Sequence, residues 1–130
     1  MMGAVADQPE HFYTVDEANA LTDHLREVLD RVREARDTIV SSAERISEGA
    51  VADGGGQEGS AAWEAARILR REVEALSARG IILRDTDTGL FDFPSRREGR
   101  TVYLCWKPDE EDRVSFWHEI NAGFPGRKRL

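Results

Sequence analysis

The sequence predicts an α+β protein: a long antiparallel helical hairpin followed by a small four-stranded antiparallel sheet arranged as a meander. Apolar residues recur at three- and four-residue steps through the first part of the chain, as amphipathic helices require. From Gly80 onward the pattern changes to short alternating segments rich in β-branched and aromatic residues. We expect a single domain over 1–130, with the hairpin in 12–80 and the sheet and tail in 81–130.

The first helix has a clear start signal. Thr14 and Glu17 have the spacing of a capping box, in which each side chain accepts a hydrogen bond from the backbone N–H of the other residue. An apolar seam follows at helical spacing: Ala18, Leu21, Leu25, Val28, Val32, Ala35, Ile39 and Ile46. The pattern predicts one helix from about 15 to 47, roughly 50 Å long at 1.5 Å per residue.

The segment 48–60, "EGAVADGGGQEGS", contains five glycines and no helical seam, which predicts a flexible connector. The helical spacing resumes with Ala62, Ala66, Leu69, Val73 and Leu76 and ends at Arg79 and Gly80, predicting a second helix over about 61–79. This helix is shorter than the first. Part of the first seam is therefore left without a partner, which predicts a homodimer.

Four strands are predicted at "IILRD", "LFDFP", "RTVYLCWK" and "RVSFWHE", separated by the turns "TDTG", "SRREG" and "PDEED". We expect Trp106 to face Val114, because a one-residue slip would mix polar and apolar side chains. This register puts Val102, Leu104, Trp106, Val114, Phe116 and His118 on one face, and Tyr103, Cys105, Ser115, Trp117 and Glu119 on the other. The second face would then be covered by a partner, the tail or a ligand.

Composition excludes several classes of protein. The whole net charge of −7 lies in the first 80 residues, so nonspecific nucleic-acid binding is disfavoured, and the basic clusters at 96–100 and 127–129 are read as solvated surface. No apolar run is long enough for a membrane span, and the N-terminus lacks a signal-peptide pattern, so we expect a cytoplasmic protein. Cys105, the single cysteine, is expected to be a buried thiol that acts as a small hydrophobe.

Six residues are candidates for a ligand site: Asp92, Tyr103, Trp117, His118, Glu119 and Arg127. His118 and Glu119 are neighbours in a strand and point to opposite faces, so we expect neither a shared metal nor any other cofactor there. Asp92 lies in an apolar segment and must find a donor, which could be His118 if their strands meet.

Two interpretations of these residues remain open. In the first, Asp92 caps a turn or pairs with Arg100 or Arg127, so that Arg127 acts as a structural latch on Asp92 or Glu119. In the second, Asp92, His118, Glu119 and Arg127 rim a small pocket for an anionic or polar ligand. Tyr103 and Trp117, expected to lie opposite each other, would be a cross-strand packing pair or the floor of that pocket.

Four segments carry a resemblance to a known family: "FYTVDEANAL", "GLFDFP" at 89–94, "VYLCWK" at 102–107 and "FWHEINAGFPGR" at 116–127. From Phe12 onward the chain resembles the uncharacterised prokaryotic family called domain of unknown function 2203. The resemblance implies a bacterial or other prokaryotic protein with a helical hairpin joined to a small antiparallel sheet. It implies no activity and supplies no catalytic residues. The glycine-rich connector departs from it, as an insertion where a tighter helical turn is expected.

Two functions are therefore considered. The favoured one is a noncatalytic assembly or adaptor module whose long acidic helix recruits a second copy or another protein. The alternative is a small-ligand-binding protein or enzyme with a site at the sheet edge around Asp92, His118 and Arg127. The first is preferred, and enzyme activity is not favoured, because the sequence shows no nucleophile with its base, no phosphate-binding loop and no metal motif.

Overall fold

The computed structural model describes residues 11–48 and 56–130. Contacts divide the chain into two compact units. One is Glu27–Ala75, and the other joins the N-terminal segment up to Arg26 to Leu76–Leu130. Within the described ranges, none of the helices combines the length and the apolar character needed to cross a membrane.

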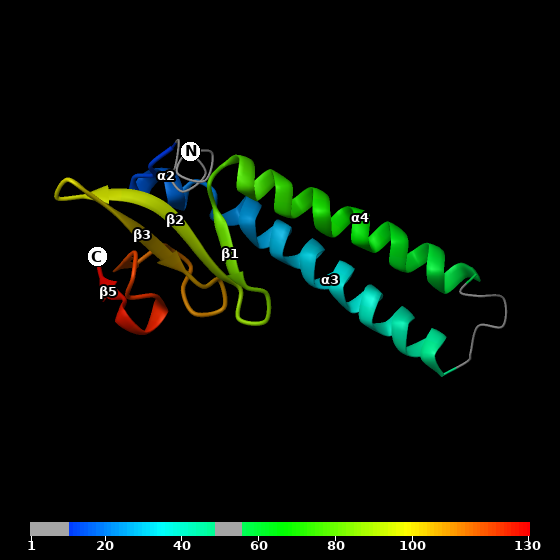
Figure 1. Ribbon diagram of the computed structural model, residues 1–130. Coiled ribbons are helices and arrows are strands. Elements are labelled where there is room, and N and C mark those ends of the chain that lie inside the picture. Colours follow the sequence, from blue (N-terminus) through cyan, green and yellow to red (C-terminus); the bar gives the residue numbers. More distant parts are fainter. Residues whose placement is uncertain (1–10, 49–55) are drawn as a thin grey trace, which may run out of the picture. The chain divides into compact units, whose positions relative to one another are not determined.

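The predicted helical hairpin is confirmed. Helices α3 (Thr22–Ser47) and α4 (Gly56–Ala78) run antiparallel beside each other (Figure 1). Arg31 joins them, with its Nε and Nη2 donating to the Glu72 carboxylate at 3.0 and 3.2 Å. Among the described residues of the unit Glu27–Ala75, the buried side chains are Val28, Leu29, Val32, Ala35, Ser42 and Ala65. Most of them belong to the apolar stripe that a two-helix packing requires.

The capping box forms as predicted, but one continuous first helix was wrong. Helix α2 (Val15–Asn19) begins with the Glu17 amide donating to Thr14 Oγ1 at 3.0 Å and the Thr14 amide donating to Glu17 Oε1 at 2.9 Å. It ends before α3 because the Thr22 hydroxyl donates to the Asn19 carbonyl at 2.9 Å. Such a local side-chain bond competes with the regular helical ladder.

The second helix begins earlier than predicted. Because α4 starts at Gly56, the part of the predicted connector from 56 to 60 is helical. The rest of that connector, 49–55, lies outside the described residues. Glycine disfavours a helix by only about 1 kcal/mol each, and Gln57 and Glu58 between the glycines are good helix formers. The glycine content of 56–60 therefore led to the prediction of a connector where the structure has the first turn of α4.

The sheet is an antiparallel meander in the order β1-β2-β3-β4-β5. Its strands are β1 (Ile82–Asp85), β2 (Leu90–Arg97), β3 (Arg100–Trp106), β4 (Phe116–Glu119) and β5 (Lys128–Arg129). The four predicted strands are present, and the tail adds β5, whose two residues are too short for an alternating pattern. Figure 1 shows the strands side by side.

Strand β2 extends into the predicted turn at 95–99. The connection to β3 is reduced to Glu98 and Gly99, both with positive φ (53° and 81°), as in the two-residue turns that match the twist of a hairpin. The extension is held by Tyr13, whose amide donates to the Pro94 carbonyl at 2.7 Å and whose carbonyl accepts from Ser95 Oγ at 2.6 Å.

The predicted register between β3 and β4 was wrong by one residue. The observed pairs are Val102 with Glu119, Tyr103 with His118, Leu104 with Trp117, and Cys105 with Phe116. Trp106 does not pair with Val114, because the indole N–H donates to the Glu111 carbonyl at 2.9 Å and the Val114 amide donates to Asn19 Oδ1 at 2.7 Å. Residues 107–115 are therefore a loop. The slip exchanges the two faces of β4.

The observed register sorts the sheet into two faces. On one face lie the buried apolar side chains of Phe91, Phe93, Val102, Leu104, Trp106 and Trp117. The other face carries polar groups from the same strands, and three of these are as deeply buried as the apolar core: Asp92, Cys105 and His118. Buried polar groups need partners, so this second face is where a site is to be sought.

Candidate functional site

The three central strands bring Asp92, Cys105 and His118 together. Asp92 on β2 is paired with Cys105 on β3, and His118 on β4 lies on the same face, diagonally from Cys105. One atom from each side chain, a carboxylate oxygen, Sγ and a ring nitrogen, lies within 4.8 Å of the other two. We call these three residues the buried polar cluster.

The Asp92 carboxylate uses its two oxygens differently. Oδ2 accepts from Arg84 Nε at 2.8 Å and lies 3.1 Å from His118 Nε2. Oδ1 accepts no hydrogen bond from any described residue, although the side chain is only 2 % exposed. A buried carboxylate oxygen without a partner is energetically costly, so Oδ1 is a ligand atom still available.

The orientation of His118 assigns one of its protons. Nδ1 lies 2.8 Å from the backbone carbonyl oxygen of Glu119, and a carbonyl can only accept. Nδ1 therefore carries a hydrogen, and Nε2 faces Asp92 either as a second N–H or as a bare lone pair. The geometry holds Nε2 toward the carboxylate in both states.

The thiol of Cys105 is protonated in this setting. Burial, followed by the nearby negative charge of Asp92, raises the pKa of Cys105 to about 12. The prediction of a buried, unreactive thiol agrees with this environment.

Arg84 and Tyr103 border the cluster. Arg84 reaches it from β1, where the pairing with β2 shifts between Leu83 and Asp85. Its guanidinium lies 5.2 Å from the centre of the Tyr103 ring, and that ring lies 5.6 Å from the His118 ring. The Arg84 side chain is 42 % exposed, so it contacts solvent as well as the buried carboxylate of Asp92.

Arg127 and Glu119 are not part of this cluster. The prediction that Arg127 latches Asp92 or Glu119 was wrong, because Arg127 Nη1 donates to Glu110 Oε1 at 2.6 Å. Its guanidinium lies 4.0 and 4.2 Å from the centres of the Phe116 and Phe124 rings. The tail is therefore held by the contacts of Arg127 with these two aromatic rings and by its ion pair with the exposed Glu110 carboxylate.

Glu119 pairs with Arg100 at 2.6 and 2.9 Å. The expected Arg100 partner for Asp92 was accordingly also wrong. Glu119 and His118 point to opposite faces, as their adjacency in a strand required. The hydrogen bonds from Arg100 lower the pKa of Glu119 below its usual value.

Trp117 belongs to the opposite face, away from Tyr103. It borders a cavity of about 310 Å³, which we call the Trp117 pocket. The pocket is lined by Phe12, Tyr13, Thr14, Val15, Ser95, Arg96, Arg97, Val102, Leu104, Trp117 and Leu130. Its volume is at the lower end of the range for small-molecule sites.

Three cations from the two basic clusters of the sequence converge on the Trp117 ring. Arg97 lies 4.6 Å, Lys128 5.4 Å and Arg100 5.9 Å from its centre. Lys128 reaches this position because it is paired with Trp117 across β4 and β5. Arg100 is neutralised by Glu119. Arg97 and Lys128 form no ion pair with any residue in 11–48 or 56–130.

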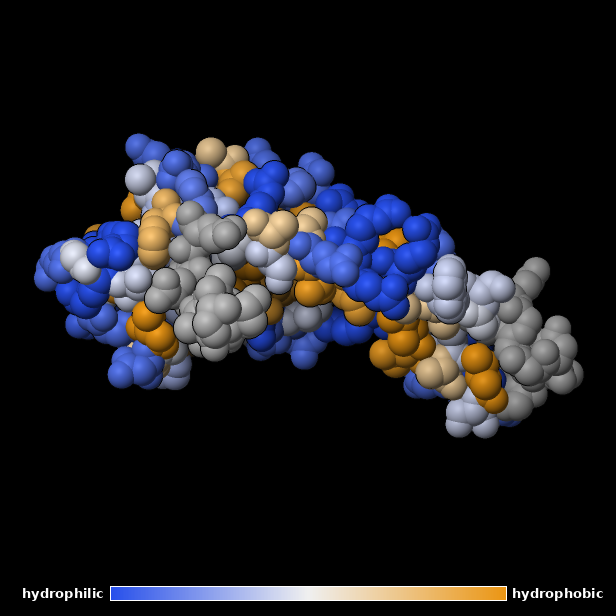
Figure 2. Space-filling view, turned by 45° about the horizontal axis from the view of Figure 1, so that its top comes forward, coloured by the Kyte–Doolittle hydropathy of each residue, from blue (hydrophilic) through white to orange (hydrophobic). Residues whose placement is uncertain are grey.

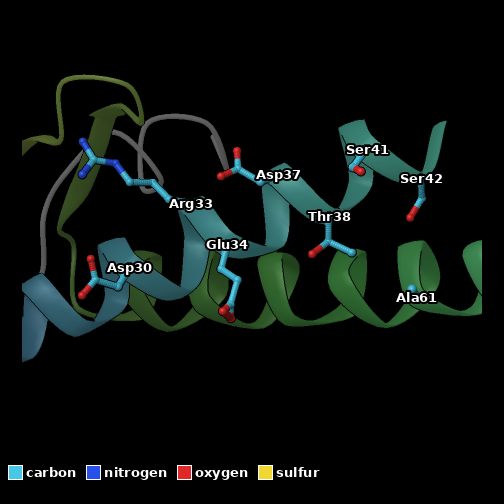
Figure 3. A pocket seen from close by; sticks show the side chains of 8 residues that line it. All are labelled: Asp30, Arg33, Glu34, Asp37, Thr38, Ser41, Ser42 and Ala61. Atoms are coloured by element: carbon cyan, nitrogen blue, oxygen red, sulfur yellow. The ribbon is translucent and has the colours of Figure 1, made fainter. Parts of the chain in front are cut away.

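A larger depression, of about 540 Å³, is lined by residues of α3 and by Ala61 of α4 (Figure 3). Its lining is mostly polar: Asp30, Arg33, Glu34, Asp37, Thr38, Ser41, Ser42 and Ala61. Figure 3 shows the carboxylates of Glu34 and Asp37 extending in different directions from the helix. Side chains that do not converge do not define a ligand position, so this surface is a solvated helix face.

Sequence reasoning missed Arg84, Arg97 and Lys128 as site residues and treated Cys105 as packing alone. The available signal was one polar residue at the centre of each of three apolar strands, Asp92, Cys105 and His118. Only the one-residue change of register places all three on one face.

The fold and the two sites define a small α+β protein with a helical hairpin and a five-stranded antiparallel meander. The chain belongs to the family described as an uncharacterized conserved protein, domain of unknown function 2203, whose model matches residues 11–130. Neither the curated proteins nor the solved structures contain a significant match to it.

Proposed function

We propose that this chain is a binding protein whose Trp117 pocket takes a small anion with an apolar body. One observation carries the proposal: Arg97, which lines the cavity, and Lys128 lie over the ring of the buried Trp117 at the cavity wall, and neither forms an ion pair with a described residue. Each contact with the ring is worth about 0.5–1 kcal/mol at an exposed site. An anion placed between the two cations would add a charge-assisted hydrogen bond.

The charge distribution supports an anionic ligand. The protein carries a net charge of −7, whereas Arg97 and Lys128 place two positive charges beside one tryptophan ring. In a pocket with low-dielectric walls, two cations raise the local concentration of anions. The alternative of a polyanion remains disfavoured, because the acidic remainder of the chain repels an extended phosphate backbone.

The lining of the pocket suggests the rest of the ligand. Phe12, Tyr13 and Trp117 are aromatic, and Val15, Val102 and Leu104 are aliphatic. Such walls fit one ring or a short aliphatic chain. The ligand class is therefore a carboxylate, sulfonate or phosphate ester on a compact apolar group.

A fluorescent anion tests this proposal. Anilinonaphthalene sulfonate, which combines aromatic rings with one sulfonate, should bind the native protein at one site. Arg97→Gln should weaken binding about tenfold, the loss expected for one charge-assisted contact of roughly 1.5 kcal/mol. Arg113→Gln is the matched control. It removes the same charge as Arg97→Gln, but Arg113 is exposed and lies outside the pocket.

The uncharged N-phenylnaphthylamine separates charge from hydrophobicity. It should bind more weakly than the sulfonate, and the difference should shrink as salt is added. Equal affinity of the two dyes, or equal losses in Arg97→Gln and Arg113→Gln, would refute an anion pocket.

Self-association through the helical hairpin is a second candidate, and it is the function favoured by the sequence. Within the unit Glu27–Ala75, large apolar side chains are exposed: Val40, Ile46, Trp63 and Val73. Trp63 is 71 % exposed, and Figure 2 shows hydrophobic surface along the hairpin. We propose a second copy of the chain as the partner, because a twofold interface needs only one apolar patch that can meet itself.

Sedimentation equilibrium tests the homodimer. The expected mass is twice the 14.6 kDa of the chain at micromolar concentration. Trp63→Lys should shift the equilibrium to monomer, whereas Ile120→Lys, at an exposed apolar position of the other unit, should not. A monomer at every concentration would exclude this candidate.

A cytoplasmic location is also proposed, since the free thiol of Cys105 suits a reducing compartment.

A further inference from the structure

We infer that Asp92, Cys105 and His118 form a binding site for one divalent transition-metal ion, with Zn²⁺ as the best fit. This inference is independent of the anion pocket, because the cluster lies on the opposite face of the sheet.

The donor set matches that metal class. The cluster offers one oxygen, one sulfur and one nitrogen within 4.8 Å of one another. Bonds of roughly 2.0–2.3 Å in a tetrahedral site place ligand atoms about 3.5 Å apart, so small side-chain rotations bring the three atoms to that spacing. A thiolate and an imidazole select borderline-soft metals and disfavour Mg²⁺ and Ca²⁺, which prefer oxygen ligands.

The orientation of His118 is the second argument. Its Nδ1–H donates to the Glu119 carbonyl at 2.8 Å, and its Nε2 is directed at Asp92 Oδ2, 3.1 Å away. Metal-binding histidines are commonly fixed in this way, with one ring nitrogen donating to a carbonyl and the other on the metal. A neutral His118 would otherwise direct its lone pair at a carboxylate lone pair, and a cation between the two removes that repulsion.

The third argument is the unpartnered oxygen of Asp92. Oδ1 is buried and receives no hydrogen bond from the residues described, whereas Oδ2 is held by Arg84 at 2.8 Å. The carboxylate can therefore bind a metal through Oδ1 and keep its hydrogen bond to Arg84. That bond is the kind of outer contact that orients metal ligands.

Binding releases a proton, because Cys105 must change from thiol to thiolate when its sulfur coordinates the metal. Three protein ligands leave one position of a tetrahedral site open, as in zinc sites that bind water or substrate. Arg84, partly exposed beside Asp92, is placed to contact an anion in that position.

Cobalt substitution tests the site directly. Metal-free, reduced protein is titrated with Co²⁺ while its absorption spectrum is recorded. Because Cys105 is the single cysteine, a thiolate-to-cobalt charge-transfer band can come only from Cys105. We expect this band to saturate at one equivalent, with intense visible bands of tetrahedral cobalt, and to disappear when Zn²⁺ is added. Absence of the charge-transfer band would overturn the inference.

Variants assign the other ligands. His118→Gln and Asp92→Asn should each weaken Zn²⁺ binding, measured by competition with a chromophoric chelator, by about a hundredfold or more. His24→Gln is the matched control, because His24 is an exposed histidine outside the cluster, and it should bind like the wild type. If His118→Gln binds Zn²⁺ as tightly as His24→Gln, the site is wrong. If a variant fails to fold, the wild-type cobalt spectrum decides.

Discussion

Asp92 and His118 are 26 positions apart in the sequence, yet Asp92 Oδ2 lies 3.1 Å from His118 Nε2 across the central strand β3. Both side chains are 2 % exposed. Cys105, the residue of β3 that pairs with Asp92, lies on the same face of the sheet and completes the cluster. The centre of the sheet is therefore organised around polar groups.

Arg84 should stabilise the fold through Asp92. Arg84→Ala removes the guanidinium that donates to Asp92 Oδ2, and we expect a loss of about 2 kcal/mol, below the usual range for a broken buried pair because solvent reaches Arg84. Urea denaturation measures the loss. Arg113→Ala is the control and should stay within about 0.5 kcal/mol of wild type. A neutral Arg84→Ala would show that solvent already compensates the charge.

Arg127 should stabilise the tail modestly. Its partner Glu110 is exposed, so the ion pair and the contacts with Phe116 and Phe124 together are worth about 1 kcal/mol after screening by solvent. A double-mutant cycle should show coupling of Arg127→Ala to Glu110→Gln and none to Asp92→Asn. Coupling to Asp92 instead would restore the latch that the sequence suggested.

The same pair predicts a pH dependence. The hydrogen bond from Arg127 lowers the pKa of Glu110 below its ordinary value of 4.5. A lowered carboxyl pKa contributes stability that is present above 4.5 and is lost as the pH falls through the folded-state value. The difference in unfolding free energy between wild type and Arg127→Ala should therefore shrink below that pH. A difference that stays constant down to the acid transition would rule out the ion pair as its source.

Glu98 occupies a backbone conformation that suits glycine better, with φ of 53° in the turn between β2 and β3. Glu98→Gly should relieve this strain and be about 1 kcal/mol more stable than Glu98→Ala, which also removes the side chain but keeps the Cβ. Thermal unfolding of the two variants measures the difference. Equal stability would show that the turn relaxes without cost.

Local sequence signals predicted the elements well, because their causes are local. The Thr14 and Glu17 capping box and the alternation of "VYLCWK" depend on a few neighbouring residues. The register of β4 depends instead on the loop 107–115, whose path is set by a distant partner, Asn19. The hydrogen bond between Val114 and Asn19 cannot be predicted from the residues near either one in the sequence.

The site was harder to predict for the same reason. The contact of Asp92 with His118 was considered, but its arginine partner, Arg84, depends on an irregular pairing of β1 with β2. The convergence of Arg97 and Lys128 on Trp117 depends on the short strand β5. Each is a product of strand register rather than of spacing in the sequence.

The most direct test of the anion pocket follows the three tryptophans, Trp63, Trp106 and Trp117, through their indole N–H signals in NMR spectra. Naphthalene sulfonate is titrated into the wild-type protein. The signal of Trp117 should shift progressively and saturate, while those of Trp63 and Trp106 stay in place, because only Trp117 lines the pocket among these three. Unchanged signals, or a shift confined to Trp63, would contradict the proposal that the Trp117 pocket binds an apolar anion.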